Sequence, residues 1–483
     1  MAKDEIYETV IPSAKRLIHS ERWQKYEFPT AIAELVDNSI DADSTEVKIR
    51  VEFEGENSWV MISDNGKGMS EIQLKEAMRY GSDSEYDEGC QGKFGLGLKK
   101  ASYSQCRHWT VATRTKSPES KILARVWDLD HVNQTNLWEI KKANDKDLDP
   151  KIKEYFRNNS GTIVLWEQLD RILEYDNPNT DRARKKIVNM CRDLEEQLAM
   201  IFHRFLRGEV EGKQIKIILN GNEIQAWDPF ARNEKATLKD FEPIRIPLEY
   251  GGAHDDVVIE PFILPPKKAF SSHQAHSKAA GPNKWNQQQG FYIYRNNRMI
   301  QSGGWCRIRA YEEHLKLARF AINFSSKFDG AFKIDVSKMY VQLPPQIRKE
   351  IEEKTKPIVA RARRIYDDNE KMDSHITSID SHSQPHQQKT VFSESSPTKI
   401  SFPGPLPLVS DSRGPLENSI NLIPIGKTSH TYVIQEEPRP IVNKLWTLDE
   451  ILQELKKLAK PAERHVIERI FKKLREQIQK KGT

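Results

Sequence analysis

The chain of 483 residues is long enough for two to four domains, and its formal charge of +5 is small beside 75 Lys or Arg and 70 Asp or Glu residues. This balance neither requires nor excludes nucleic acid as a partner, and the four cysteines lack the paired spacing of a disulfide framework or a zinc site. The N-terminus has no apolar signal core and no run approaches ~20 apolar residues, so we expect a soluble, cytoplasmic protein without membrane contact.

The first predicted elements are two helices. Residues 1–28 are expected to be partly helical, with Ile18, Arg22 and Trp23 near a turn before Pro29 starts the second helix. This second helix contains the sequence AIAELVDNSIDAD, which carries the first candidate site residues.

Polar side chains gather on one face of this second helix. At ~3.6 residues per turn, Glu34, Asn38 and Asp41 share a narrow arc, whereas the isoleucine and valine side chains of the stretch point away from it. Such a pattern is usually only a solvated face. A magnesium–nucleotide site would also use it, because Mg²⁺ prefers hard oxygen ligands and a hydrolytic water needs a nearby carboxylate.

Two strands follow, at residues 46–53 and 59–65, and the second ends in a glycine-containing turn. In the sequence SDNGKGMS, Asp64 can accept a hydrogen bond from an amine, while Gly66 and Gly68 allow backbone conformations that other residues resist. The strand end is therefore a second candidate for ligand binding.

A glycine-rich segment is the third candidate. Ser70 and Gln73 have the spacing of a capping box for a helix, which leaves residues 81–97 as a predicted mobile flap. Its end, in the sequence GCQGKFGLGLKKAS, precedes a helical pattern, so free backbone N–H groups are available to phosphates. The spacing fits neither a Walker loop nor a dinucleotide fingerprint. The glycines and lysines concerned are Gly92, Gly95, Gly97, Lys93, Lys99 and Lys100.

These three stretches, in this order, resemble the nucleotide-binding domain of the GHKL ATPase superfamily, which is named for gyrase B, the heat-shock chaperone, histidine kinases and MutL. The sequence ELVDNSIDA most resembles that of the MORC-type branch and its bacterial relatives. The resemblance covers residues 25–170 strongly and residues 210–345 more loosely. It implies a Bergerat-type α/β sandwich that binds ATP and Mg²⁺.

The resemblance also implies residue roles. Glu34 would orient and deprotonate the attacking water, Asn38 would bind Mg²⁺, and Asp64 would bind the adenine amine. Asp37 and Asp41 would hold the helix and the flap, which is the ATP lid of the family, in place. Gly66 and Gly68 would make room for the purine, and the lid glycines would offer N–H groups to phosphates with Lys93 or Lys99 as a charge partner. The remaining nucleotide-binding residues would be Met69, Leu96 and Thr162.

Further strands are predicted at residues 109–115, 122–129 and 161–169, which gives one mixed sheet with helices covering one face. The amphipathic helix at residues 181–208 marks the expected domain change. A second α/β unit is expected over residues 213–345, starting with the strand KIILN and a hairpin at Asn220-Gly221.

In MutL-like and MORC-like proteins the second domain sends a lysine to the γ-phosphate. Lys338 best fits that role because it lies between a predicted strand and the segment VQLPP. Arg295, Asn297 and Arg298 are alternatives near the site or the domain interface. Each of these side chains is equally compatible with an ordinary surface position.

The remaining segments carry weaker signals. Residues 265–289 are polar and basic without periodicity, which predicts a mobile loop, and a helix over residues 344–369 leads out of the core. Residues 371–443 are rich in Ser, Pro, His and Gln and are expected to form a disordered linker. Residues 444–483 predict two helices broken at a proline, with 11 Lys or Arg against 6 Asp or Glu and an apolar stripe that needs a partner.

We therefore expect an α+β protein with an ATP-binding domain at 1–180, a transducer-like α/β domain at 181–370, the linker at 371–443 and the helical hairpin at 444–483. The expected function is that of a slow Mg²⁺-dependent ATPase acting as a dimeric clamp. DNA is one candidate target, beside a partner nuclease or methyltransferase in bacterial defence, and this expectation rests on fold-level analogy. A nucleotide-gated chaperone or scaffold is the alternative. A histidine kinase fits less well because His203 follows the ATPase domain instead of preceding it.

Overall fold

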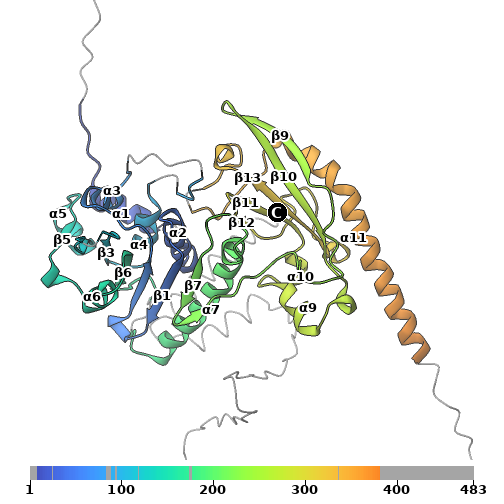
Figure 1. The fold of residues 1–483 in the computed structure, drawn as a ribbon, viewed down its shortest axis with the longest axis horizontal. Helices are drawn as coiled ribbons and strands as arrows, with labels where there is room; N and C mark the ends of the chain where they lie inside the picture. The colour runs from blue at the N-terminus through green and yellow to red at the C-terminus, as the bar shows by residue number, and fades with distance from the viewer. Residues whose placement is uncertain are drawn as a thin grey trace, which may run out of the picture. The chain divides into compact units, whose positions relative to one another are not determined.

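The structure is a computed structural model, and it describes residues 8–23, 26–82, 89–92, 95–117, 119–172, 177–335 and 337–380 (Figure 1). These residues lie in one compact unit that spans residues 1–388. They form an eight-stranded sheet and a five-stranded sheet with helices packed on both, which confirms the α+β class. The predicted hairpin at 444–483 and the linker beyond residue 380 lie outside the described residues.

The two N-terminal helices are present as predicted. Helix α1 spans Ala14–Trp23, and helix α2 spans Phe28–Asp41 with Pro29 in its first turn, where a missing N–H costs nothing. Residues 28–37 of α2 are buried on every side, while Asn38 is exposed. The helix is thus a core element, in which Glu34 and Asp37 are buried among other protein groups and Asn38 meets solvent.

The first sheet has the order β5-β4-β3-β6-β2-β1-β7-β8, with β1 and β7 parallel and the other neighbours antiparallel. The expected mixed sheet is therefore confirmed. The strands of this sheet are β1 Glu46–Glu52, β2 Trp59–Asp64, β3 His108–Arg114, β4 Leu123–Asp128, β5 Lys141–Ala143, β6 Gly161–Glu167, β7 Lys216–Leu219 and β8 Asn222–Glu223.

Strand β7 corrects one expectation, because the sequence KIILN was expected to open the second unit. In the structure β7 follows the long helix α7, Asp181–Ile201, and pairs in parallel with β1 of the first sheet. The hairpin to β8 turns at Asn220 and Gly221, with φ angles of 48° and 87°, as its sequence predicts. A parallel partner needs a crossover, and α7 supplies it.

Helices cover both faces of this sheet, although one covered face was expected. Alternate strand residues such as Ile49 and Val60 pack into a large core with α2 and α7. The opposite face carries a small core in which Trp59 packs with Ile152 of helix α6, Pro150–Phe156. The other helices and 3-10 turns of this part are η1 Gly55–Asn57, α3 Glu71–Met78, α4 Gly97–Tyr103, α5 Leu129–Thr135, η2 Asp145–Asp147 and α8 His203–Leu206.

The second sheet has the order β12-β11-β13-β10-β9. Its long partner is helix α11, Pro345–Asp380, which contacts β9, β10 and β13 and runs along this sheet in Figure 1. Its strands and 3-10 turns are β9 Ile244–Tyr250, β10 Ala253–Ile263, β11 Gly290–Arg295, β12 Arg298–Gln301, η4 Glu313–Leu315, β13 Ala318–Phe324 and η5 Ser326–Phe328. Helix α11 confirms the predicted exit helix and continues to Asp380, so the linker does not begin at residue 371.

The basic segment at residues 265–289 is folded, which corrects the prediction of a mobile loop. It contains η3 Lys267–Ala269, α9 His273–Ala280 and α10 Lys284–Gln287, and the Ser272 side chain caps α9. The rings of His276 and Trp285 stack with centroids 4.7 Å apart, and the Arg319 guanidinium donates to the Ala279 carbonyl oxygen at 2.9 Å. Aromatic packing therefore orders a segment whose polar composition predicted no ordered structure.

Among the described residues, no helix has the length and apolar character needed to cross a membrane.

Candidate nucleotide site

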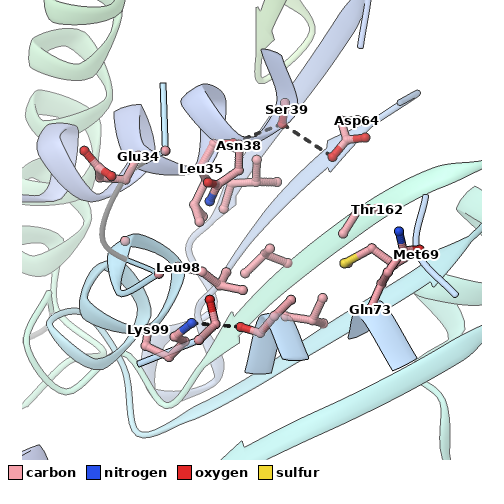
Figure 2. A pocket seen from close by; sticks show the side chains of 18 of the residues that line it. Glu34, Leu35, Asn38, Ser39, Asp64, Met69, Gln73, Leu98, Lys99 and Thr162 are labelled. Atoms are coloured by element: carbon pink, nitrogen blue, oxygen red, sulfur yellow. Dashed lines mark hydrogen bonds between the residues drawn. The ribbon is translucent and has the colours of Figure 1, made fainter. Parts of the chain in front are cut away.

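A cavity of about 290 Å³ lies between α2, α4 and the ends of β2 and β6 (Figure 2). It collects residues from all three motif stretches and from the second domain. Its lining is Glu34, Leu35, Asn38, Ser39, Ile62, Asp64, Met69, Gln73, Ala77, Ser82, Gly92, Gly95, Gly97, Leu98, Lys99, Val111, Thr162, Val164 and Lys338.

Asp64 and Thr162 stand at one end of this cavity, away from Glu34 and Lys99 (Figure 2). They face each other because β2 and β6 pair with these two residues in register. Asp64 Oδ1 accepts from the Gly66 backbone N–H at 2.9 Å, and the Ser39 hydroxyl lies 3.4 Å from Oδ2. Burial raises the pKa of Asp64 to about 6, so a buried acid with spare acceptor capacity faces this end of the cavity.

Gly66 and Gly68, which were expected to make room for the purine, are not among the residues that line the cavity. A Cβ on Gly66 would lie 2.7 Å from the Ala42 carbonyl oxygen, and one on Gly68, where φ is 68°, would lie 2.4 Å from the Arg114 carbonyl oxygen. These glycines allow the turn behind Asp64 to pack closely against neighbouring backbone. Leu96 is also absent from the lining, although Gly95 and Gly97 on either side are present.

The wall between the two ends is apolar. Sequence reasoning missed these positions, since it identified Met69 alone among the apolar residues of the lining. Strand alternation contains a signal for Ile62, which lies two residues before Asp64 and therefore on the same face. The missed apolar residues are Leu35, Ile62, Ala77, Leu98, Val111 and Val164.

Lys99 lies at the other end of the cavity and is 2% exposed. Its Nζ donates to the Ala77 carbonyl oxygen at 3.0 Å, and burial lowers its pKa to about 8. Lys100 points elsewhere and pairs with Glu21 of α1 at 2.8 Å, so the two adjacent lysines have different roles. Lys93 lies outside the described residues.

The first residue of α4 approaches the carboxylate of α2 closely. A Cβ on Gly97 would lie 2.6 Å from Glu34 Oε2, so only glycine leaves this approach free. Asn38, one turn further along α2, is exposed and lines the same cavity. This end of the cavity therefore combines carboxylate, amide and ammonium groups, the set that a metal-bound polyphosphate requires.

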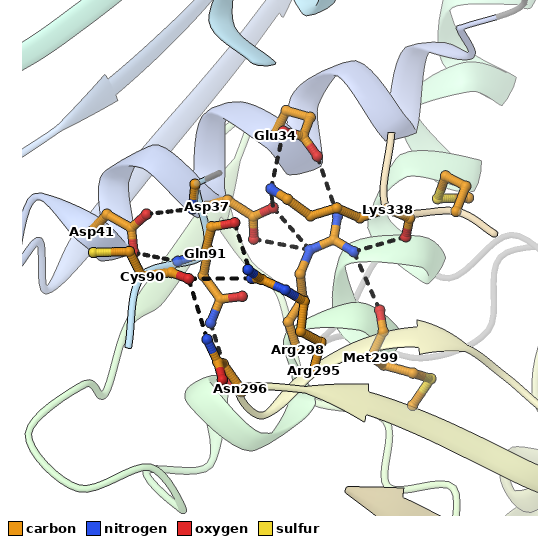
Figure 3. Close-up of polar contacts among 12 residues, drawn as sticks. Glu34, Asp37, Asp41, Cys90, Gln91, Arg295, Asn296, Arg298, Met299 and Lys338 are labelled. Carbon is orange, nitrogen blue, oxygen red and sulfur yellow. Dashed lines mark hydrogen bonds and ion pairs between the residues drawn. The ribbon is translucent and has the colours of Figure 1, made fainter. Parts of the chain in front are cut away.

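A buried cluster of four charges joins the cavity to the second domain (Figure 3). Lys338 Nζ lies 3.1 Å from Glu34 Oε2 and 2.8 Å from Asp37 Oδ2. The Arg298 guanidinium donates to Asp37 at 2.9 Å, and its Nη2 lies 3.9 Å from Glu34 Oε1. Two acids and two bases thus balance in a region where an unpaired charge would be costly.

Glu34 keeps some capacity for a ligand within this cluster. Its Oε1 accepts no hydrogen bond from the part of the chain that the structure describes. Burial raises the pKa of the Glu34 carboxyl, and the neighbouring Lys338 opposes that rise. A carboxylate whose pKa is raised toward the working pH is a suitable proton acceptor.

Lys338 lies near the cavity for a reason that the sequence did not show. It was placed after a predicted strand, but no strand forms among the described residues 331–344. Lys338 lies in a turn with φ at 52°, and its carbonyl oxygen accepts from Arg298 Nη1 at 3.2 Å. The strained turn is thus supported by a side chain of the same cluster.

The other predicted residues of the second domain have different partners. Arg298 lies in the cluster, whereas Asn297 accepts from Arg204 at 3.1 Å, away from the nucleotide cavity. On α2, Asp41 accepts from the backbone N–H groups of residues 91 and 92, which agrees with a role in holding the glycine-rich segment. Asp37 instead binds the second domain.

Comparison with known families bears on this arrangement. Residues 26–162 match the family model described as histidine kinase-, DNA gyrase B-, and HSP90-like ATPase. This part of the chain is a GHKL-type ATPase domain. The GHKL-type domain includes α2, the turn after β2, the glycine-rich segment and Thr162, and its family implies ATP binding and hydrolysis. A search of curated proteins found no match to the chain.

Proposed function

We propose that the protein is a Mg²⁺-dependent ATPase that works as a molecular switch, in which the second domain responds to the nucleotide through Lys338. The observation that carries this proposal is the contact between Lys338 and Glu34 inside the cavity of the GHKL-type domain. Hydrolysis of ATP next to Glu34 would change the partners of Lys338. It would therefore change the contact between the two domains.

The roles follow from the positions in the cavity. Asp64 accepts a hydrogen bond from the adenine amine at one end, and Lys99 with Gly92 faces the phosphates at the other. Glu34 accepts the proton of the attacking water. Asn38 offers an amide oxygen to Mg²⁺, and bound Mg²⁺ supplies charge neutralisation at the phosphates.

Lys338 can change partners without leaving Asp37 unpaired. Arg298 is fully buried and donates to Asp37 through a bond of its own, separate from that of Lys338. When a terminal phosphate draws Lys338 away, Asp37 therefore keeps a counterion, and only Glu34 loses one. That loss leaves Glu34 more ready to take a proton from water, which couples ligand arrival to catalysis.

Transfer of the phosphoryl group to histidine has less support. His203, the histidine considered for that role, is fully buried, and its Nε2 lies 2.8 Å from the Tyr294 hydroxyl oxygen. Burial lowers its pKa well below the usual value. Water is therefore the proposed acceptor.

The experiment is phosphate release from Mg²⁺·ATP by the purified full-length chain, together with binding of a fluorescent ATP analogue. We expect slow turnover and Mg²⁺-dependent nucleotide binding, and we expect Asn38→Ala to lose that Mg²⁺-dependent binding. Addition of a non-hydrolysable analogue should also produce dimers in analytical ultracentrifugation, because we propose a dimeric clamp. Absence of nucleotide binding by the folded protein would contradict the proposal.

We also propose DNA as the target of the clamp, in line with the MORC resemblance and with a partner nuclease or methyltransferase. Support comes from the 11 Lys or Arg against 6 Asp or Glu in residues 444–483. DNA affinity should then fall steeply with salt, by a slope of about −0.9 per neutralised phosphate. Deleting residues 444–483 should flatten that slope and leave basal ATPase activity unchanged.

The alternative target is a protein, as for a nucleotide-gated chaperone or scaffold. If the full-length chain shows no salt-sensitive DNA binding, with or without an ATP analogue, residues 444–483 are better interpreted as a protein-docking hairpin. Their apolar stripe would then form the contact.

A further inference from the structure

The glycine-rich segment is held from two sides at residues 90–92. On one side, Asp41 of α2 accepts from the backbone N–H groups of Gln91 and Gly92, at 2.9 and 2.8 Å. On the other side, Arg295 at the end of β11 and Asn296 in the turn after it form hydrogen bonds with Cys90 and Gln91 (Figure 3). The segment therefore bridges the two domains directly.

Arg295 forms the centre of the second side. Its Nη1 donates to the carbonyl oxygens of Cys90 and Gln91, at 3.2 and 3.1 Å. Its Nε and Nη2 bind the two carboxylate oxygens of Asp329, at 2.7 and 2.9 Å. Arg295 and Asp329 are each 2% exposed, so this bidentate pair fixes the guanidinium plane in a region shielded from water.

Side-chain amides complete the contact. The Asn296 amide donates to the Cys90 carbonyl oxygen at 3.2 Å, and the Gln91 amide donates to the Asn296 carbonyl oxygen at 2.9 Å. Gln91 is 1% exposed, which is unusual for a glutamine in a glycine-rich segment. The backbone of residues 90–92 thus bonds to α2 through N–H groups and to the second domain through carbonyl oxygens.

We propose that Arg295 and Asn296 are positioning residues that set the phosphate end of the cavity from the second domain. They hold residues 90–92 against Asp41, and this placement puts Gly92 in the cavity lining. The contact forms a second link between the domains, separate from Lys338, because it acts through the backbone of the glycine-rich segment and not through the cluster on α2. Its effect on nucleotide affinity rests on the proposed function.

The turn itself offers a matched pair of variants. Asn296 and Asn297 both have positive φ, at 45° and 68°, so glycine is tolerated at either position. Asn296→Gly removes the bond to Cys90 together with the one that Asn296 Oδ1 accepts from the Ser326 backbone N–H, whereas Asn297→Gly removes a contact with Arg204 on the other side of the turn. Gln91→Ala provides an independent variant that leaves the turn intact.

Hydrogen–deuterium exchange of the peptide containing residues 90–92, without nucleotide, tests the placement. We expect Asn296→Gly and Gln91→Ala each to speed exchange of the Gln91 and Gly92 amides by ~10-fold, the worth of a hydrogen bond or two, and Asn297→Gly to leave it near the wild-type rate. Combining Asn296→Gly with Asp41→Asn should change the free energy of amide exchange by less than the sum of the two single changes, because both substitutions act on one segment. Unchanged exchange in both variants, or an equal rise in Asn297→Gly, would overturn the proposal.

Nucleotide binding then tests the functional half. Asn296→Gly should weaken affinity for an ATP analogue several-fold and Asn297→Gly should not. Equal affinity in these two variants would overturn the positioning role even with altered exchange. If wild-type protein binds no nucleotide, the proposed function fails, while the exchange result still decides whether the second domain holds residues 90–92.

Discussion

Lys338 Nζ lies within hydrogen-bonding distance of both Glu34 and Asp37, at 3.1 and 2.8 Å, although 304 residues separate Lys338 from Glu34 along the chain. All three side chains are almost completely buried. A lysine from the second domain therefore pairs with both acids on the helix that carries the proposed catalytic base, and Arg298 supplies the second positive charge. This relationship makes separate predictions for the base and for the lysine.

The first prediction concerns the base. Glu34→Ala should keep nucleotide binding and slow hydrolysis ~10²- to 10⁴-fold, which is the usual contribution of a positioned base. Single-turnover phosphate release with a binding assay on the same samples measures both quantities. Glu249→Ala, at an exposed position on β9, is the control and should match wild type. Unchanged turnover in Glu34→Ala would exclude it as the base.

The second prediction concerns the lysine. Lys338→Ala should impair hydrolysis and ATP-driven closure, while its affinity for ADP stays nearly intact. Small-angle scattering with a non-hydrolysable analogue measures the closure. It should also lower the free energy of unfolding by ~3 to 5 kcal/mol, because Glu34 and Asp37 lose a buried partner. Lys333→Ala, at an exposed position nearby, is the control. Equal losses of affinity for ADP and for the ATP analogue would instead indicate a folding role.

The third prediction concerns Asp64. Burial raises the pKa of this residue from 3.8 to about 6. A raised folded-state pKa means that ionisation destabilises the fold, so the penalty is absent below pH ~4 and complete above pH ~6. At pH 7.5 the free energy of unfolding of Asp64→Asn, measured by denaturant titration, should therefore exceed that of wild type by up to ~3 kcal/mol. The two free energies should converge near pH 4. The variant should also lose nucleotide binding. A stability difference independent of pH would contradict the buried ionised acid.

The fourth prediction concerns Lys99. Burial lowers the pKa of this residue to about 8. Phosphates favour the charged ammonium, so nucleotide binding at pH 8.5 should take up a proton, and affinity should fall as the pH rises above 8. Isothermal titration in buffers of different ionisation enthalpy measures this uptake. Lys99→Gln should abolish it, whereas Lys100→Gln, whose partner is Glu21, should retain it. The same proton count in wild type and Lys99→Gln would remove Lys99 from the phosphate site.

Local patterns in the sequence determined much of the first domain. The capping box of Ser70 and Gln73 forms as predicted, because it depends only on residues three apart on one helix. Strand alternation and turn residues likewise placed β1, β2 and β6, although the register that sets Asp64 opposite Thr162 came only from the structure. These features depend on short-range geometry that every residue carries with it.

Only the tertiary structure decided the partners of the buried charges. Asp37 pairs with Arg298 across 261 residues, and the sequence contains no periodicity that links them. Residues 265–289 fold against Arg319 despite a composition typical of loops, and β7 joins the first sheet instead of the second. Burial costs a charge its hydration, so its partner is chosen by what packing brings near it, and packing depends on the whole chain at once.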